Sequence, residues 1–203
     1  MSAQQPRITH RAEQPYAAIR GVVTMRTISA ISDRLPEVFG WLGARGVEPA
    51  GAPFFRYDRI DMDTTLEIEA GVPLATPVAG QGDVFTGVLP AGRYAVLAHT
   101  GHPDDLLAVT ARLLDWAAAE GLAWDVRETP DGDLWGCRLE SYLTDPAEQP
   151  DMAKWDVELA FRLADCHRKG ESDPRNPAPD SLFRTFRTRC RGRFTFHGRG
   201  DST

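Results

Sequence analysis

The sequence is poor in cysteine and has no long apolar run. Its three cysteines, Cys137, Cys166 and Cys190, lie far apart among 203 residues, so neither a disulfide framework nor a zinc motif is indicated. No stretch of about 18 apolar residues occurs, which argues against a membrane-spanning helix. The polar segment 1–11 lacks the apolar core of a signal peptide. We therefore expect a cytoplasmic protein with reduced thiols.

The chain also lacks the short motifs of common catalytic sites. It contains neither a Gly-x-x-x-x-Gly-Lys phosphate loop nor a Gly-x-Ser-x-Gly nucleophile elbow. His99 and His102 have no third ligand nearby in the sequence, whereas a metal site needs at least three. The sequence therefore predicts no metal site and no cofactor.

The charged residues are unevenly distributed along a chain whose net charge is −6. Residues 167–203 hold nine Lys/Arg and four Asp/Glu, a net charge of +5, whereas residues 1–166 hold 14 and 25, a net charge of −11. An acidic body favours neutral or cationic ligands over nucleic acid. We expect the folded body to bind no nucleic acid directly and no membrane.

Both ends of the chain differ in pattern from its middle. Segment 1–15 is predicted to be an N-terminal extension. Segment 167–203 has no helical or strand period, and its composition is typical of a disordered basic tail. Two alternatives stay open for this tail. Its interleaved basic and aromatic residues would suit nucleic acid or an anionic surface, or the segment is a non-native extension of the coding region.

The middle of the chain contains one pattern twice. Three landmark residues recur 75 positions later, so that Ile31, Trp41 and Gly46 correspond to Leu106, Trp116 and Gly121. Between these landmarks both stretches read as an amphipathic helix, with a strand-like run before it and two after it. We therefore expect one α+β domain over residues 16–166, with two β-α-β-β repeats at about 16–74 and 83–163.

The boundaries of the individual elements follow from the same periods. In the first repeat, strands are expected at 16–26, 54–60 and 66–74. Pro36 lies inside the helical stripe at 28–42, where it kinks the helix or moves its start. In the second repeat, a helix is expected from Asp104 to Gly121, and strands are expected at 83–89, 92–100, 134–144 and 155–163. Loops are expected at 126–133 and 145–154.

Two phrases of the second repeat resemble a known family. The run GRYAVLAHTG at 92–101 precedes the helix, and the run LESYLTDP at 139–146 follows it. With the duplication, they are similar to the GyrI-like small-molecule-binding family, the effector-binding domain of AraC- and MerR-type multidrug-responsive regulators. The resemblance covers about Tyr16 to Leu163. It implies a curved antiparallel sheet, two helices packed on one side, and a central cleft for aromatic, often cationic compounds. Because no helix-turn-helix pattern precedes Tyr16, we expect a stand-alone member.

Glu140 is the principal candidate site residue, because the family's pocket glutamate lies in the same E-x-Y phrase. A carboxylate in a partly desolvated cleft attracts a delocalised cation. Tyr142 lies two residues further on and therefore on the same strand face. Asp58 aligns with Glu140 at an offset of 82 positions, although a solvent-facing role is the simpler reading for it. The remaining candidates are aromatic residues that would otherwise pack in the core: Tyr57, Phe55, Trp135 and Trp155.

Three functions are consistent with these residues. The first is a multidrug-binding sensor or sequestering protein for hydrophobic aromatic, cationic small molecules. The second is a hydrolase of reactive cyclopropane-type electrophiles, with Glu140 as the general base and Tyr142 or Asp58 as its partner. The third is inhibition of gyrase or of another protein partner, for which the acidic body would supply the charge.

Overall fold

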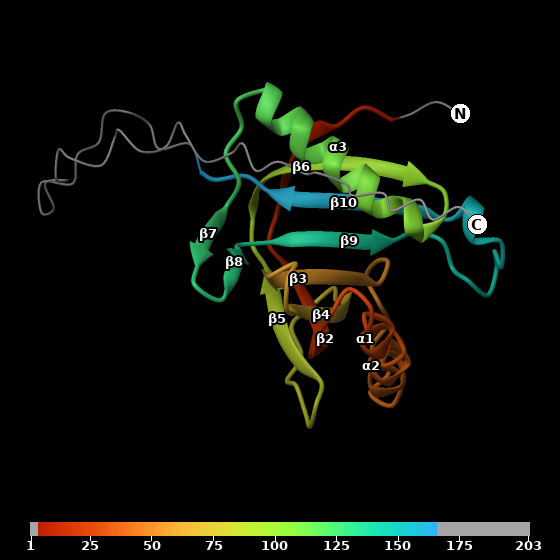
Figure 1. Cartoon of the computed structure of the whole chain (residues 1–203). Helices are drawn as coiled ribbons and strands as arrows, with labels where there is room; N and C mark the ends of the chain where they lie inside the picture. Colours follow the sequence, from red (N-terminus) through yellow and green to blue (C-terminus); the bar gives the residue numbers. More distant parts are fainter. Residues whose placement is uncertain (1–3, 166–203) are drawn as a thin grey trace, which may run out of the picture. The chain divides into compact units, whose positions relative to one another are not determined.

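The computed structural model describes residues 4–165, and the tail predicted at 167–203 lies outside them. The described part of the chain forms one antiparallel sheet with helices against it (Figure 1). Its elements are β1 (Arg7–Arg11), β2 (Gln14–Val23), α1 (Ser29–Ser32), α2 (Leu35–Gly43), β3 (Phe54–Ile60), β4 (Leu66–Pro73), β5 (Phe85–Leu89), β6 (Gly92–Thr100), η1 (Pro103–Asp105), α3 (Leu106–Ala119), β7 (Val126–Thr129), β8 (Gly132–Trp135), β9 (Arg138–Tyr142), η2 (Met152–Lys154) and β10 (Asp156–Arg162). None of the helices within residues 4–165 has the length and apolar character needed to cross a membrane.

The sheet is built from the two repeats. Its strand order is β1-β6-β10-β9-β3-β4-β2-β5, and the hairpin β7–β8 is attached through β3. The first repeat supplies β2, β3 and β4, and the second supplies β6, β9 and β10. β3 and β9 pair at the centre, where Phe55 lies opposite Glu140. The α+β fold predicted from the sequence is thereby confirmed, and the two repeats share a continuous sheet.

The edge strands are exchanged between the repeats. β1 pairs antiparallel with β6 of the second repeat, from Arg7 opposite Val96 to Arg11 opposite Gly92. β5 lies in the second repeat of the sequence but pairs with β2 of the first. The sheet therefore begins at Arg7, inside the segment that was expected to be an N-terminal extension.

Pro36 divides the first helical stripe into two pieces. α1 ends at Ser32, and α2 begins at Leu35 with Pro36 in its first turn. An N–H group in the first turn has no partner within the helix, so proline loses no hydrogen bond there. The stripe at 28–42 therefore forms two short helices, whereas the uninterrupted second stripe forms the 14-residue helix α3.

The single strand predicted at 134–144 is wrong, because the chain is interrupted between β8 and β9. The Gly136 N–H donates to the Asp125 carbonyl over 2.8 Å, and a Cβ at Gly136 would lie 1.8 Å from Asp125 Oδ2. Any larger residue at this position would force the Asp125 side chain, which is paired with Arg162, to move. Residues 126–135 form the hairpin β7–β8, which includes the whole of the loop predicted at 126–133.

Buried apolar side chains form two clusters on the helical face of the sheet and one on the opposite face. One cluster lies with α1 and α2 against β2 and β4, and another lies with α3 against β6 and β10. The third, which includes Tyr16, Phe54 and Tyr94, covers the other face. Ile60 and Tyr142 pack against both helical-face clusters. The boundary between the two clusters therefore runs over β3 and β9.

Candidate ligand-binding cleft

A cavity of about 500 Å³ opens at this boundary, between the segment that precedes α1 and helix α3, and over β3 and β9. This volume is in the range of small-molecule sites. Apolar side chains from both repeats form most of its wall: Met25, Ile28, Ile60, Met62, Leu66, Leu106 and Leu107. Its polar groups come mainly from β3 and β9, namely Tyr57, Arg138, Glu140 and Tyr142, with Asp104 and Thr110 from the α3 side.

Glu140 is the buried carboxylate of this cavity, with 9% of its surface exposed. The Tyr57 hydroxyl donates to its Oε2 over 3.3 Å, and the Tyr142 hydroxyl donates to its Oε1. Burial raises the pKa of Glu140, although hydrogen bonds from Tyr142 and Tyr57 and the charge of Arg138 act in the opposite direction. The pKa values of both tyrosines are raised by burial and by the carboxylate, so they keep their protons.

A second cavity of about 760 Å³ adjoins the first and shares Ile28, Pro103 and Tyr142 with it. Phe55 and Trp155 line this second cavity. The Phe55 and Tyr142 rings meet edge to face with centroids 5.5 Å apart, and the Trp155 indole N–H donates to the Gln149 carbonyl over 2.7 Å. We refer to the two adjoining cavities together as the cleft, with Glu140 in the first cavity and Trp155 in the second.

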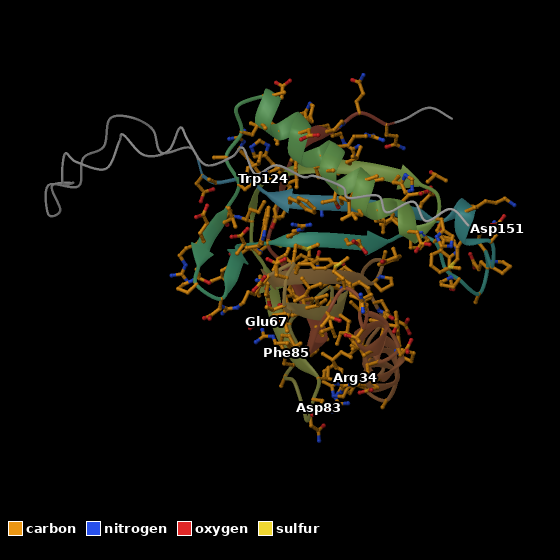
Figure 2. All side chains as sticks on the ribbon, in the orientation of Figure 1. Arg34, Glu67, Asp83, Phe85, Trp124 and Asp151 are labelled. Carbon is orange, nitrogen blue, oxygen red and sulfur yellow. The ribbon has the colours of Figure 1, made fainter. Side chains whose placement is uncertain are left out.

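The structure therefore places five of the seven predicted site residues on the cleft and two elsewhere. Trp135 is buried away from both cavities and packs on Trp124 and Phe161, with ring centroids 5.9 Å and 5.7 Å away. Trp124, labelled in Figure 2, lies on the chain between α3 and β7. Trp135 thus belongs to the core beneath α3.

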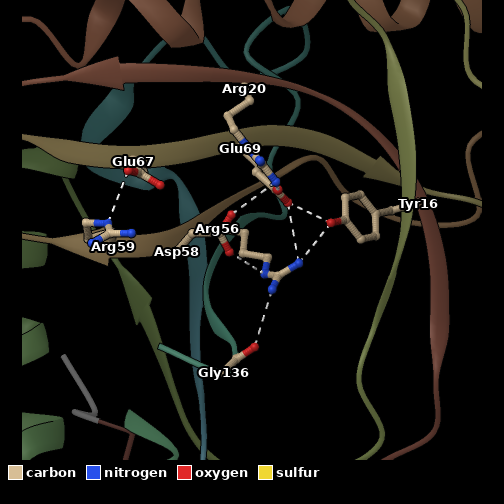
Figure 3. A network of polar contacts seen from close by, with 8 residues as sticks. All are labelled: Tyr16, Arg20, Arg56, Asp58, Arg59, Glu67, Glu69 and Gly136. Atoms are coloured by element: carbon tan, nitrogen blue, oxygen red, sulfur yellow. Dashed lines mark hydrogen bonds and ion pairs between the residues drawn. The ribbon is translucent and has the colours of Figure 1, made fainter. Parts of the chain in front are cut away.

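Asp58 lies on the opposite face of the sheet from Glu140. The β3–β4 register shifts between Tyr57 and Arg59, so Asp58 is the extra residue of a β-bulge. Figure 3 shows its carboxylate among charged side chains of β2, β3 and β4. The offset of 82 matched Asp58 to Glu140 by position, but it is Phe55 that lies opposite Glu140 and Tyr57 that contacts it.

The group around Asp58 is a buried ion network that the sequence reasoning did not identify (Figure 3). Its centre is Glu69, which is fully buried and accepts hydrogen bonds from the Tyr16 hydroxyl over 2.6 Å and from Arg20. Arg56 Nε lies 3.0 Å from Asp58 Oδ1 as an ion pair, without the N–H direction of a hydrogen bond. These contacts join β2, β3 and β4 on the face opposite the cleft.

The two carboxylates of this network differ in protonation. Burial and the adjacent Glu69 raise the pKa of Asp58 to about 7. Burial also acts to raise the pKa of Glu69, but hydrogen bonds from Arg20 and Tyr16 outweigh it and leave that pKa below its usual range. None of the network's residues lines either cavity of the cleft, and their contacts hold β2, β3 and β4 together.

Arg138 is a charged cleft residue that the sequence analysis did not identify. It precedes Glu140 by two positions on β9, so the period of a strand places both on one face. The same rule had already identified Tyr142. Among residues 4–165, His, Cys, Asp and Glu side chains form no group of three or more that could hold a metal ion.

Comparisons with known proteins agree with this geometry. The model of the GyrI-like small molecule binding domain matches residues 4–164. The crystal structure of the EcmrR C-terminal domain is similar, with 17% identity and a TM-score of 0.62 over 79% of this chain and 97% of that one. No match was found among curated proteins.

Two further solved structures share the fold. The EcmrR chain in the cryo-EM structure of the EcmrR–DNA complex is 20% identical, with a TM-score of 0.63 over 78% of this chain. The match spans 57% of the length of that EcmrR chain. SAV2435 bound to tetraphenylphosphonium is 9% identical, with a TM-score of 0.54 over 79% of this chain and 94% of that one. At these identities the likeness shows the fold.

Proposed function

Because the chain belongs to the GyrI-like family of small-molecule-binding domains, we propose that it binds hydrophobic aromatic cations in the cleft over β3 and β9. It would act as a multidrug-binding sensor or as a protein that sequesters such compounds. The observation that carries this proposal is the Glu140 carboxylate, buried inside a mostly apolar cavity that is large enough for a drug-sized molecule.

The surroundings of Glu140 support a cationic ligand. A buried carboxylate is costly unless it is paired, and an aromatic cation supplies both a counter-charge and apolar surface. The two tyrosine hydroxyls fix the direction of the carboxylate. Met25, Met62 and Leu107 are exposed and lie on the cavity wall, which offers apolar contact at its mouth. The similar fold of SAV2435, which was solved with tetraphenylphosphonium, is consistent with this class of ligand.

Calorimetric titration with tetraphenylphosphonium tests the proposal. We expect wild type to bind, and Glu140→Gln to lose about 1–3 kcal/mol of binding free energy, the scale for a hydrogen-bonded charged group. Glu128→Gln is the matched control, because Glu128 is exposed on β7 and lies outside the cleft. Equal affinity of wild type and Glu140→Gln would show that the carboxylate does not meet the ligand.

Hydrolysis of a cyclopropane-type electrophile is a second candidate, favoured by the contact between Glu140 and Tyr142. Glu140 would take a proton from water, the water oxygen would bond to a ring carbon as a carbon–carbon bond opens, and Tyr142 would give a proton to the product. The raised pKa of Tyr142 makes it a weak acid, so binding ranks first. Product formation by wild type that disappears in Glu140→Gln would support hydrolysis. If wild type forms no more product than Glu140→Gln, the hydrolase proposal is wrong.

A further inference from the structure

Arg138 is a second charged group of the cleft, and it is held on aromatic rings. Its guanidinium carbon lies 4.5 Å from the ring centroid of Phe161, 4.9 Å from that of Trp135 and 5.7 Å from that of Tyr57. These distances are within the range of cation–π contacts. Arg138 also lines the cavity of Glu140. Of these three rings, Tyr57 lines the cavity, whereas Phe161 and Trp135 belong to the core beneath α3.

The charge of the Arg138 guanidinium acts on the neighbouring Glu140, but no hydrogen bond joins the two side chains. No hydrogen bond or ion pair joins it to another residue of 4–165, and the Glu140 oxygens accept from Tyr57 and Tyr142 instead. Burial lowers the pKa of Arg138, yet an arginine remains charged at neutral pH. The side chain is half-buried in the cavity wall, and its five N–H donors suit a carboxylate.

The spacing of Glu140 and Arg138 along β9 determines how far apart the charged groups of a matching ligand must be. Residues two apart on a strand are separated by about 7 Å along it and face the same side. Glu140 and Arg138 therefore present a negative and a positive group side by side on the floor of one cavity. The other charged group on the wall is Asp104, which is solvent-exposed near the mouth.

We propose that the cleft selects zwitterionic aromatic ligands, whose cationic nitrogen faces Glu140 and whose carboxylate is bound by Arg138. This inference rests on the proposed function and narrows its ligand class. A ligand with a cation alone would meet the repulsion of Arg138 and would offer its N–H donors no acceptor, whereas a ligand with both charges satisfies both side chains.

Rhodamine B and its ethyl ester are the probes that test this selectivity, because esterification removes the carboxylate charge and keeps the aromatic cation. In fluorescence anisotropy titrations, we expect wild type to bind rhodamine B about tenfold to hundredfold more tightly than the ester, the scale of a charge-assisted hydrogen bond. In Arg138→Gln, this preference should be lost while the ester binds at least as well as it does to wild type.

Arg138→Lys and Arg127→Gln complete the experiment. Lysine keeps the charge but loses the paired geometry and the stacking, so it should keep only part of the preference. Arg127 is exposed on β7, and its substitution should leave the preference intact. If wild type binds rhodamine B and its ethyl ester equally, the inference of zwitterion selectivity is wrong, whatever the variants do. The proposed function would still stand, because the cation would still bind. Binding of neither dye would overturn both.

Discussion

At the scale of single residues, the protonation of Glu140 controls how the cleft meets a cation. Burial raises the pKa of this carboxyl, so part of it is protonated at a pH where an exposed glutamate is fully ionised. Its neighbours do not titrate near neutral pH, because Tyr57 and Tyr142 have raised pKa values and Arg138 stays charged. Glu140 is therefore the group in the cleft interior that links ligand affinity to pH.

The affinity for a pure cation such as tetraphenylphosphonium should consequently depend on pH. As the pH falls through the raised pKa of Glu140, the carboxyl takes up a proton and the cation loses its counter-charge, so affinity decreases. Above that pKa the affinity should reach a plateau. Calorimetric titration at pH values from about 5 to 9 measures this, and Glu140→Gln should show no such slope. A wild-type affinity that is flat over the range would contradict the account.

Asp58 should affect stability rather than binding. Its folded-state pKa of about 7 lies above the ordinary value of 3.8, so folding favours its protonated form. The stability that results is complete below pH about 4 and is lost as pH rises through about 7, by roughly 1–3 kcal/mol. Asp58→Asn should flatten this part of the curve of unfolding free energy against pH. Asp115→Asn, an exposed change on α3, is the control and should retain the wild-type slope. If Asp58→Asn also retains that slope, Asp58 is not the group that causes this pH dependence.

At the scale of elements, helix α3 has two different faces: one packs in the core, and the other lines the cleft. Leu113 is fully buried beneath the helix, whereas Leu107 is 64% exposed and lines the Glu140 cavity. Leu113→Ala should lower the free energy of unfolding by about 2–5 kcal/mol. Leu107→Ala should change it by less than about 0.5 kcal/mol but weaken the binding of an aromatic cation. Denaturant unfolding and ligand titration of both variants check this, and the opposite pattern would mean that Leu107 belongs to the core.

The elements also show what the sequence could predict. The sequence places β3, β4, β6 and β10 correctly, because each is a short run of apolar, aromatic and β-branched residues with a buried face, and β10 also alternates with a period of two. β1 (Arg7–Arg11) has no such pattern, since its residues are mostly exposed at the edge of the sheet. The break at Gly136 depends on a contact with Asp125, and no local pattern reveals such a contact.

The site residues likewise divide into those that a local sequence pattern reveals and those that depend on contacts between distant parts of the chain. Glu140 and Tyr142 share a face by strand period, and Arg138 could have been found by the same argument. Asp58 directly follows Tyr57 on β3, so the strand period already places it on the face opposite the cleft. The offset of 82 failed because it matched positions in the two repeats and not their strand pairing, in which Phe55 lies opposite Glu140. The Glu69 network joins residues 53 positions apart, from Tyr16 to Glu69, and such pairing arises only in three dimensions.

At the scale of the described domain, the duplication explains where a ligand site can form. Each repeat packs its own helices on its own strands, and the two helical-face clusters meet only through residues such as Ile60 and Tyr142. The exchange of β1 and β5 ties the repeats together at both edges of the sheet. The sheet is thus continuous beneath a gap between its helices. The repeats differ at this gap, since Phe55 of the first faces Glu140 of the second.

The central claim is that this gap is the ligand site and that Glu140 is its charged centre. A crystal structure of the protein grown with saturating tetraphenylphosphonium tests it most directly. We predict the phosphonium in the cleft over β3 and β9, within about 6 Å of the Glu140 carboxylate, with its rings among the apolar residues of the two cavities. A phosphonium bound outside this cleft, with Glu140 still enclosed by its two tyrosines and no ligand beside it, would contradict the account.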